Sequence, residues 1–273
     1  MRFDAYCASI NGAKLVTVAE AIASGLDGIV AMGKPMRRYG QVLNIDCGPR
    51  MAAWVGYQED TGQIYVEGKG ETSPLLANTI RTHFPAHQVP RADVCDDVDE
   101  EGAFERLQAV IRANKGARVK AGYVALPDDV QDGRTWAVGS RGGVAYLRLY
   151  EAGKHPDRLA FNRPNWVRPE LEVRPQYARD KSAAATMQPV DFWGFAGWSH
   201  TVGQAITSTS ISRFEPIVRK YSGDKTTRYI ATTFRRHLEE MFASGEDIGR
   251  TFAHIWEEDD AFARSTGYRG RRP

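Results

Sequence analysis

The sequence predicts an α+β protein with a mostly antiparallel sheet, built as two related α+β halves and followed by C-terminal helices. Three observations indicate this class. Segments such as 144–151 and 167–174 alternate apolar and polar residues with the period of two that is typical of half-buried strands. The segment 101–114 instead repeats apolar residues at helical spacing. Beyond Gln176 the helical pattern continues to the end of the chain.

The first predicted half covers residues 1–88. Its expected elements are a helix within 16–29, a strand at 41–45, two strands at 51–57 and 63–67, and a helix from Ser73 to about His83. Between the two later strands, Glu59-Asp-Thr-Gly is typical of a hairpin turn. Ser73 is the expected N-cap of the second helix, because Pro74 then occupies the first helical position.

The second predicted half covers residues 89–190 and repeats this mixture of elements. It is expected to contain a helix at 101–114 and strands near 89–98, 119–126, 135–138, 144–151 and 167–174. A helical region is expected at 191–267, with its clearest amphipathic segments at 230–242 and 248–262. The tail 268–273 is basic and predicted to be disordered, and its charge suits weak phosphate contact.

The composition is that of an ordinary globular protein of 273 residues, 42% hydrophobic, with a net charge of +2. Long apolar runs and a secretory signal are both missing from the sequence, so we expect a cytoplasmic protein without membrane contact. Three scattered cysteines without CxxC spacing predict neither a disulfide framework nor a thiolate zinc site. The charge is segregated: residues 134–181 hold ten Lys/Arg and five Asp/Glu, whereas 93–105 hold seven acids and no Lys/Arg.

Three strand-like segments carry ionisable side chains on one face. The residues that share a face are Tyr146, Arg148 and Tyr150 in the first segment, Arg168, Glu170, Glu172 and Arg174 in the second, and Arg91, Asp93, Cys95 and Asp97 in the third. If the three strands are neighbours, one sheet face holds tyrosine, arginine and carboxylate groups together. That combination suits metal-dependent phosphoryl transfer, although the sequence alone does not establish that the strands are adjacent.

The motifs in these segments are Arg-x-Asp-x-x-x-Asp, Leu-Arg-Leu-Tyr-Glu-x-Gly-Lys and Arg-x-Glu-x-Glu, in that order. Together they resemble the replication initiation factor family of rolling-circle plasmids and filamentous phages. Gly139-Ser-Arg141 and Asp191-Phe-Trp-Gly194 are also similar to that family. The resemblance covers about residues 89–200 and is loose over the first 88 residues, where it depends on Val66-Glu-Gly-Lys-Gly70.

The resemblance implies a Rep catalytic core that nicks and rejoins single-stranded or supercoiled origin DNA through a 5′-phosphotyrosine bond. The position that matches the nucleophile is Tyr150, and a host helicase and DNA polymerase are the implied partners. The acids that match a site for a divalent cation, Mg²⁺ or Mn²⁺, are Asp93, Asp97, Glu170 and Glu172. The DNA contacts that we expect are Ser140, Arg141, Lys154 and Arg174.

Physical chemistry supports these roles independently. A phenol has a pKa near 10, so Tyr150 needs a cation or a general base to become a nucleophile at neutral pH. Hard cations prefer oxygen ligands, which carboxylates on adjacent strands supply. We expect Arg148 and Arg168 to assist catalysis by pairing with the non-bridging phosphate oxygens.

Each of these residues also has a structural interpretation. Tyr146 shares the face of Tyr150 and is the nearest rival nucleophile, about 13 Å along the strand by the rise per residue. The acids are alternatively members of salt bridges with neighbouring arginines. Pro169 lacks an amide hydrogen, so it predicts that its strand is at an edge or contains a bulge.

Two other functions remain open from the sequence: a DNA-binding regulator with a degenerate site, and a metallonuclease in which Tyr150 is structural. None of the six histidines has the His-x-His spacing of the related histidine-containing enzymes, and His83 and His87 are interpreted as structural. No glycine-rich segment continues into Gly-Lys-Ser/Thr, so we expect no ATPase activity. Phe192, Trp193, Phe195 and Trp198 are interpreted as core residues, with base stacking as the alternative.

Overall fold

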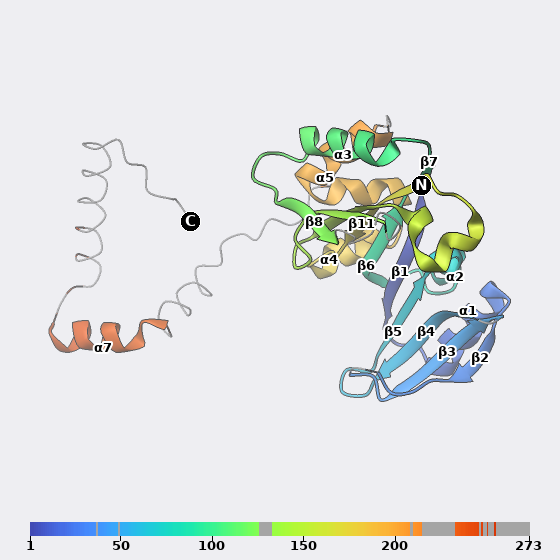
Figure 1. Cartoon of the computed structure of the whole chain (residues 1–273). Helices are drawn as coiled ribbons and strands as arrows, with labels where there is room; N and C mark the ends of the chain where they lie inside the picture. The colour runs from blue at the N-terminus through green and yellow to red at the C-terminus, as the bar shows by residue number, and fades with distance from the viewer. Residues whose placement is uncertain are drawn as a thin grey trace. The chain divides into compact units, whose positions relative to one another are not determined.

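The computed structural model describes residues 1–36, 38–48, 50–125, 133–207, 210–214 and 233–245, together with residues 247, 250 and 254. The chain divides into two units, Met1–Ile217 and Val218–Pro273 (Figure 1). The first contains the sheet and helices α1 (Leu15–Leu26), α2 (Ser73–His83), α3 (Ala103–Asn114), α4 (Ala178–Ala184) and α5 (Gly197–Thr207). In the second, the described helix is α7 (Arg235–Ala243). None of the described helices is long and apolar enough to span a membrane.

A single sheet of 11 strands organises the first unit, in the order β2-β3-β4-β5-β1-β6-β11-β10-β9-β8, with β7 beside β11. The pairings are antiparallel throughout, as the sequence predicted. The strands are β1 (Arg2–Ile10), β2 (Ile29–Met32), β3 (Gln41–Cys47), β4 (Arg50–Gln58), β5 (Gln63–Lys69), β6 (Gln88–Cys95), β7 (Val98–Asp99), β8 (Ala121–Ala125), β9 (Thr135–Gly139), β10 (Ala145–Tyr150) and β11 (Trp166–Val173). The α+β class is therefore confirmed.

The sheet contains two halves with the same internal order, which meet where β1 pairs with β6. The first half runs β1-α1-β2-β3-β4-β5-α2, and the second runs β6-α3-β8-β9-β10-β11-α4 with β7 inserted. Helix α1 begins at residue 15 and ends at residue 26, and α3 begins at 103 and ends at 114, so both ends of α3 lie 88 residues after those of α1. The two halves thus place equivalent strands on either side of a shared seam.

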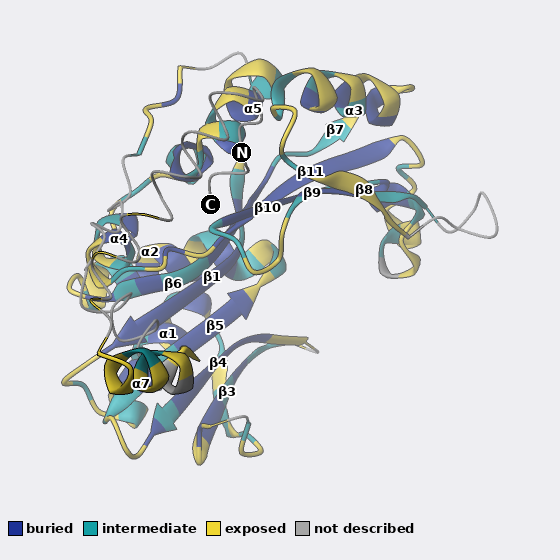
Figure 2. Ribbon diagram, turned by 90° about the vertical axis from the view of Figure 1, so that its left-hand side faces the viewer, coloured by how far each residue is buried: buried dark blue, intermediate teal, exposed yellow. Residues whose placement is uncertain are grey.

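The apolar core lies between one face of the sheet and the helices. Leu147 and Leu149 of β10 and Leu171 of β11 join it from the second half, and Ile22 of α1 joins it from the first. Burying one such side chain contributes about 1.5–3 kcal/mol. Phe192, Trp193 and Phe195, in the 3₁₀ helix η5 (Pro189–Phe195), are buried in the same core, so the core interpretation is confirmed for these three. Figure 2 shows the buried positions concentrated along the central strands.

Local sequence signals were correct at one turn and wrong at one helix end. Gly62 closes the β4–β5 hairpin with a positive φ of 65°, a conformation that glycine adopts without strain. Ser73 is not an N-cap, however, because Thr72 occupies that position. The Ser73 hydroxyl instead donates to the carbonyl of Asp4, 3.0 Å away, and so fixes α2 to β1.

Two strands, β1 and β2, were not predicted, and β1 is central in the sheet. Of the predicted helix at 230–242, the described part begins at Arg235 in α7. The predicted helix at 248–262 and the basic tail at 268–273 lie outside the described residues, apart from 250 and 254.

Pro169 does not mark an edge strand, because β11 lies between β6 and β10. Its carbonyl accepts from the Asp96 amide at 3.2 Å, and in an antiparallel strand the N and C=O of a residue point the same way. The missing N–H therefore faces the interval after β6 ends at Cys95 and before β7 begins at Val98. The proline therefore accepts from Asp96 but cannot donate back, and the ladder lacks one hydrogen bond at the gap between β6 and β7.

Candidate active site

The three polar-faced strands are adjacent, in the order β6-β11-β10. Register places Arg148 opposite Glu170 and Tyr150 opposite Arg168. Glu172 lies opposite Asp93 on the other side of β11. Directly opposed residues of antiparallel strands share a face, so these side chains gather on the face that does not carry the helices. The condition on which the predicted site depended is therefore met.

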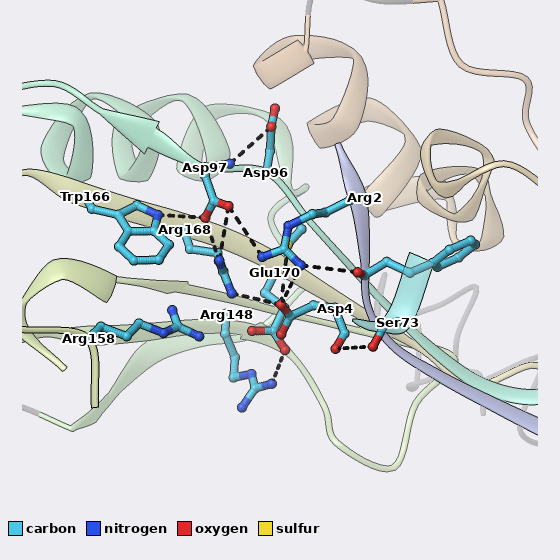
Figure 3. A network of polar contacts seen from close by, with 12 residues as sticks. Arg2, Asp4, Ser73, Asp96, Asp97, Arg148, Arg158, Trp166, Arg168 and Glu170 are labelled. Carbon is cyan, nitrogen blue, oxygen red and sulfur yellow. Dashed lines mark hydrogen bonds and ion pairs between the residues drawn. The ribbon is translucent and has the colours of Figure 1, made fainter. Parts of the chain in front are cut away.

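The Tyr150 hydroxyl donates to Glu170 Oε2 at 2.8 Å. Arg148 donates to the other oxygen of the same carboxylate (Figure 3). Burial raises the pKa of the Tyr150 phenol above its ordinary value, and the negative charge of Glu170 raises it further. Tyr150 is thus a protonated phenol whose proton already points at a carboxylate acceptor.

Arg158, in the 3₁₀ helix η4 (Pro156–Phe161), lies beside the Tyr150 ring. Its Nη1 is 3.5 Å from the Tyr150 hydroxyl oxygen, and its guanidinium carbon is 5.6 Å from the ring centroid. The same carbon is 5.1 Å from the centroid of the Trp166 ring. Two aromatic rings therefore hold this cation next to the hydroxyl.

Asp93 and Glu172 face each other across β6 and β11, with Arg91 between them. Arg91 Nε and Nη2 bond the two oxygens of Asp93 at 2.8 and 2.5 Å, and Nη2 is 3.2 Å from Glu172. Asp93 is only 2% exposed, and burial raises the pKa of its carboxyl to about 6 despite the attraction of Arg91. Glu170 and Glu172 raise it further, so the face concentrates negative charge.

Asp97 belongs to a different network, because β6 ends at Cys95 and Asp97 lies in the connection to β7. The register against β11 is nevertheless the same on both sides of this gap, with Cys95 opposite Glu170 and Val98 opposite Val167, so Asp97 keeps the face of Asp93 although the strand ends before it. Arg168 bonds the two Asp97 oxygens at 2.6 and 3.1 Å, and Trp166 Nε1 donates at 2.7 Å (Figure 3). Burial alone would raise the pKa of Asp97, but the hydrogen bonds from Arg168 and Trp166 hold it below its ordinary value.

Arg168 is 2% exposed and is neutralised from two sides. Its Nη1 bonds Asp4 Oδ1 at 2.9 Å, while Asp97 takes Nε and Nη2. Arg148 differs, because its side chain is 31% exposed and its Nε is buried without a hydrogen-bond partner. The sequence assigned both arginines the same role, but they differ. All three guanidinium nitrogens of Arg168 are hydrogen-bonded, whereas Arg148 Nε has no hydrogen-bond partner.

The residues predicted to contact DNA lie toward both ends of β10. Ser140 and Arg141 are exposed in the β9–β10 turn, with the Arg141 guanidinium 5.6 Å from the Tyr146 ring centroid. Lys154, which follows Tyr150 in the 3₁₀ helix η3 (Ala152–Lys154), is 3.1 Å from Glu151. Arg174 bonds Glu172 at 2.6 Å.

No family model and no curated protein matches this sequence. Among solved structures, the chain is similar to a rolling circle replication initiator protein from Geobacillus stearothermophilus. The match has a TM-score of 0.51 and 16% identity and covers 69% of this chain and 80% of the other. The two proteins share a fold. That fold is the one that the motif resemblance implies.

Four acids were predicted as metal ligands: Asp93, Asp97, Glu170 and Glu172. Within the described part of the chain, no group of three or more His, Cys, Asp or Glu residues is arranged to hold a metal ion. Asp93, Glu170 and Glu172 do offer carboxylate oxygens from neighbouring strands, but arginines contact each of them. In Asp97 both oxygens are bonded by Arg168.

Sequence reasoning missed three residues of this site. Asp4 and Arg2 belong to the unpredicted strand β1, where Asp4 bonds both Arg2 and Arg168. Arg2 and Asp4 are two apart in Arg2-Phe-Asp4, and this alternation was the available signal. Arg158 belongs to the basic stretch 134–181 but lies outside its strands, so no periodicity indicated it.

Proposed function

We propose that this protein is a rolling-circle replication initiator that nicks and rejoins single-stranded origin DNA through a 5′-phosphotyrosine at Tyr150. The observation that carries the proposal is the hydrogen bond from the Tyr150 hydroxyl to Glu170, on a polar sheet face of the initiator fold. A nucleophile hydrogen-bonded to a base that is itself oriented by a third group is the general arrangement of nucleophilic catalysis. Here Glu170 is the base and Arg148 orients it.

The proposed step is a transesterification. The Tyr150 oxygen attacks the phosphorus of one DNA linkage as its proton passes to Glu170, forming a P–O bond to tyrosine and breaking the bond to the 3′ oxygen. The 3′ oxygen leaves as a hydroxyl after taking up one proton. One phosphodiester replaces another, so the reverse reaction rejoins the strand without an energy source. The free 3′-hydroxyl is a primer end, which makes a host polymerase and helicase the proposed partners.

The arginines have separate roles in this proposal. Arg148 orients Glu170, and its partly exposed guanidinium is the proposed donor to a non-bridging phosphate oxygen. Arg168 positions the site, because its three nitrogens are bonded to Asp97 and Asp4. Ser140, Arg141, Lys154 and Arg174 are the proposed contacts along the DNA backbone.

We also propose that Asp93, Glu170 and Glu172 hold a Mg²⁺ or Mn²⁺ ion. These carboxylates are hard oxygen donors from adjacent strands. Burial raises the pKa of Asp93, and the charges of Glu170 and Glu172, which a cation would offset, raise it further. A bound ion would neutralise charge on the phosphate. We do not include Asp97, because its carboxylate accepts three hydrogen bonds, two from Arg168 and one from Trp166, which fix it beside Arg168.

The decisive experiment uses a library of end-labelled single-stranded oligonucleotides with a randomised segment, incubated with the whole protein and Mn²⁺. We expect a detergent-resistant protein–DNA adduct that disappears in Tyr150→Phe and when a chelator replaces the metal. Tyr146→Phe is the matched control, because Tyr146 lies on the same face of β10 and opposes Glu172 instead of Arg168. An adduct that survives in Tyr150→Phe would exclude Tyr150 as the nucleophile.

The same assay distinguishes the alternatives. Cleavage without an adduct would favour a metallonuclease, and binding without cleavage would favour a DNA-binding regulator.

A further inference from the structure

We infer that Arg158 is a catalytic residue that binds the phosphate attacked by Tyr150 and stabilises the charge that develops on it. This inference rests on the proposed phosphotyrosine chemistry. It assigns the role of phosphate ligand to a residue outside the strands, in the segment that follows β10.

The position of Arg158 is set by its neighbours. Its guanidinium lies between the rings of Tyr150 and Trp166, with Nη1 3.5 Å from the oxygen proposed to attack. The preceding η3 turn is also closely packed, because a Cβ at Gly153 would lie 1.8 Å from the carbonyl oxygen of Arg163. Only glycine fits there, so the segment that carries Arg158 is held tightly against the chain beyond it.

The charge of Arg158 is available, unlike that of its neighbours. The arginines around this face that pair with a carboxylate are Arg2, Arg91, Arg148, Arg163, Arg168 and Arg174. Among the described side chains, the ion pairs of this face do not involve Arg158. A partly buried guanidinium that none of the described carboxylates neutralises is matched to an anionic ligand, and a DNA phosphate is the anion that must approach Tyr150.

The proposed step gives this charge a specific use. As the Tyr150 oxygen bonds to phosphorus and the 3′ oxygen departs, negative charge is distributed over the non-bridging oxygens. A guanidinium beside the attacking oxygen contacts these oxygens through two donors and favours that charge distribution. Arg168 cannot take this role, because its three nitrogens already bond carboxylates.

The test measures single-turnover adduct formation on an oligonucleotide that the wild-type protein attacks. We expect Arg158→Ala to slow the reaction by about 10²–10³-fold, the usual effect of removing one such donor, with a much smaller change in DNA affinity. Arg158→Lys should recover part of the rate. The control is Arg163→Ala: Arg163 also lies over Trp166, at 4.7 Å, but pairs with Asp99, so the rate should stay near wild type.

A neutral linkage separates catalysis from folding. With a methylphosphonate at the scissile position the developing charge is reduced, so Arg158→Ala and the wild type should react at similar rates. A wild-type rate for Arg158→Ala on ordinary DNA, or an equal defect on both substrates, would overturn the inference while leaving the phosphotyrosine proposal intact. If the wild-type protein formed no adduct at all, the proposed function would fail first, and the role of Arg158 with it.

Discussion

Each half of the sheet contains a glutamate at the same position, but the two glutamates have different surroundings. Glu67 pairs with Cys7 of β1 in the first half, and Glu170 pairs with Cys95 of β6 in the second. The two cysteines are 88 residues apart, as are the ends of α1 and α3, so Glu67 and Glu170 are equivalent. Each also accepts a hydrogen bond from a tyrosine hydroxyl, at 3.2 Å from Tyr65 and 2.8 Å from Tyr150.

The surroundings of the two carboxylates differ. The residue opposite Glu67 is Trp54, whereas the residue opposite Glu170 is Arg148. Trp54 packs with Tyr39 and Tyr65, at ring-centroid distances of 5.5 and 5.2 Å, into a small aromatic cluster. The first half therefore fills this face with apolar contacts, while the second fills it with charge.

The two halves share the same arrangement of strands, so the polar site depends on the side chains of the second half and not on the fold alone. Apolar packing stabilises a sheet face, whereas partly buried ion pairs contribute little net stability because desolvation offsets their attraction. The second half keeps four charged residues, Arg148, Arg168, Glu170 and Glu172, where the first half shows that an aromatic cluster also fits. The proposed chemical role would account for the charge that is retained there.

The largest difference between the halves should appear when the equivalent carboxylates are neutralised. Glu170→Gln removes the proposed proton acceptor, and we expect adduct formation to slow by about 10²–10⁴-fold. Glu67→Gln makes the same chemical change in the first half and should leave the rate within a few-fold of wild type. Single-turnover kinetics of both variants check this, and equal defects would show that the site is not confined to the second half.

The sequence predicted the site more completely than it predicted the sheet. Alternation placed Tyr150, Arg148 and Glu170 on one face because a strand has a fixed period of two. It did not reveal adjacency, since strand order depends on long-range pairing. The count also placed Asp97 on the face of Asp93, and the register of β7 against β11 continues that of β6 although the strand ends at Cys95.

Other parts of the site escaped prediction for different reasons. The strand β1 was overlooked although its central residues, including Tyr6 and Ala8, are buried. Arg158 has no periodic pattern, because its position depends on the rings of Tyr150 and Trp166, which the fold brings together. Pro169 misled the prediction, because the sheet accommodates its one missing N–H at the gap between β6 and β7, inside the sheet and not at its edge.

A second, smaller effect concerns stability. Trp54→Ala should destabilise the protein by about 3–5 kcal/mol, because it empties the aromatic cluster. The double variant Arg148→Met, Glu170→Gln removes the equivalent polar pair together and should cost less than about 1 kcal/mol, or even stabilise, while abolishing adduct formation. Urea unfolding of both variants measures the difference. A double variant as unstable as Trp54→Ala would mean that the charges hold the second half together.

The smallest effect is expected at the seam between the halves, where His87 precedes β6 and contacts Tyr6 of β1. His87 Nδ1 is 2.7 Å from the Phe84 carbonyl, so it donates there, and the neutral Nε2 accepts from the Tyr6 hydroxyl at 2.7 Å. Burial lowers the pKa of His87, while it raises the pKa of Tyr6 to about 12. The folded protein therefore holds a neutral imidazole against a phenol that stays protonated.

The sign of the pH dependence follows from the lowered pKa. Below about pH 6.5 the unfolded chain binds a proton that folded His87 resists, so the free energy of unfolding falls as pH decreases, by at most about 1.4 kcal/mol per unit. In His87→Gln this component should disappear and the dependence between pH 5 and 7 should become flatter. His83→Gln is the control, because His83 is exposed and should leave the slope unchanged. Urea unfolding at several pH values measures it, and parallel curves for wild type and His87→Gln would show that the seam tolerates a charged imidazole.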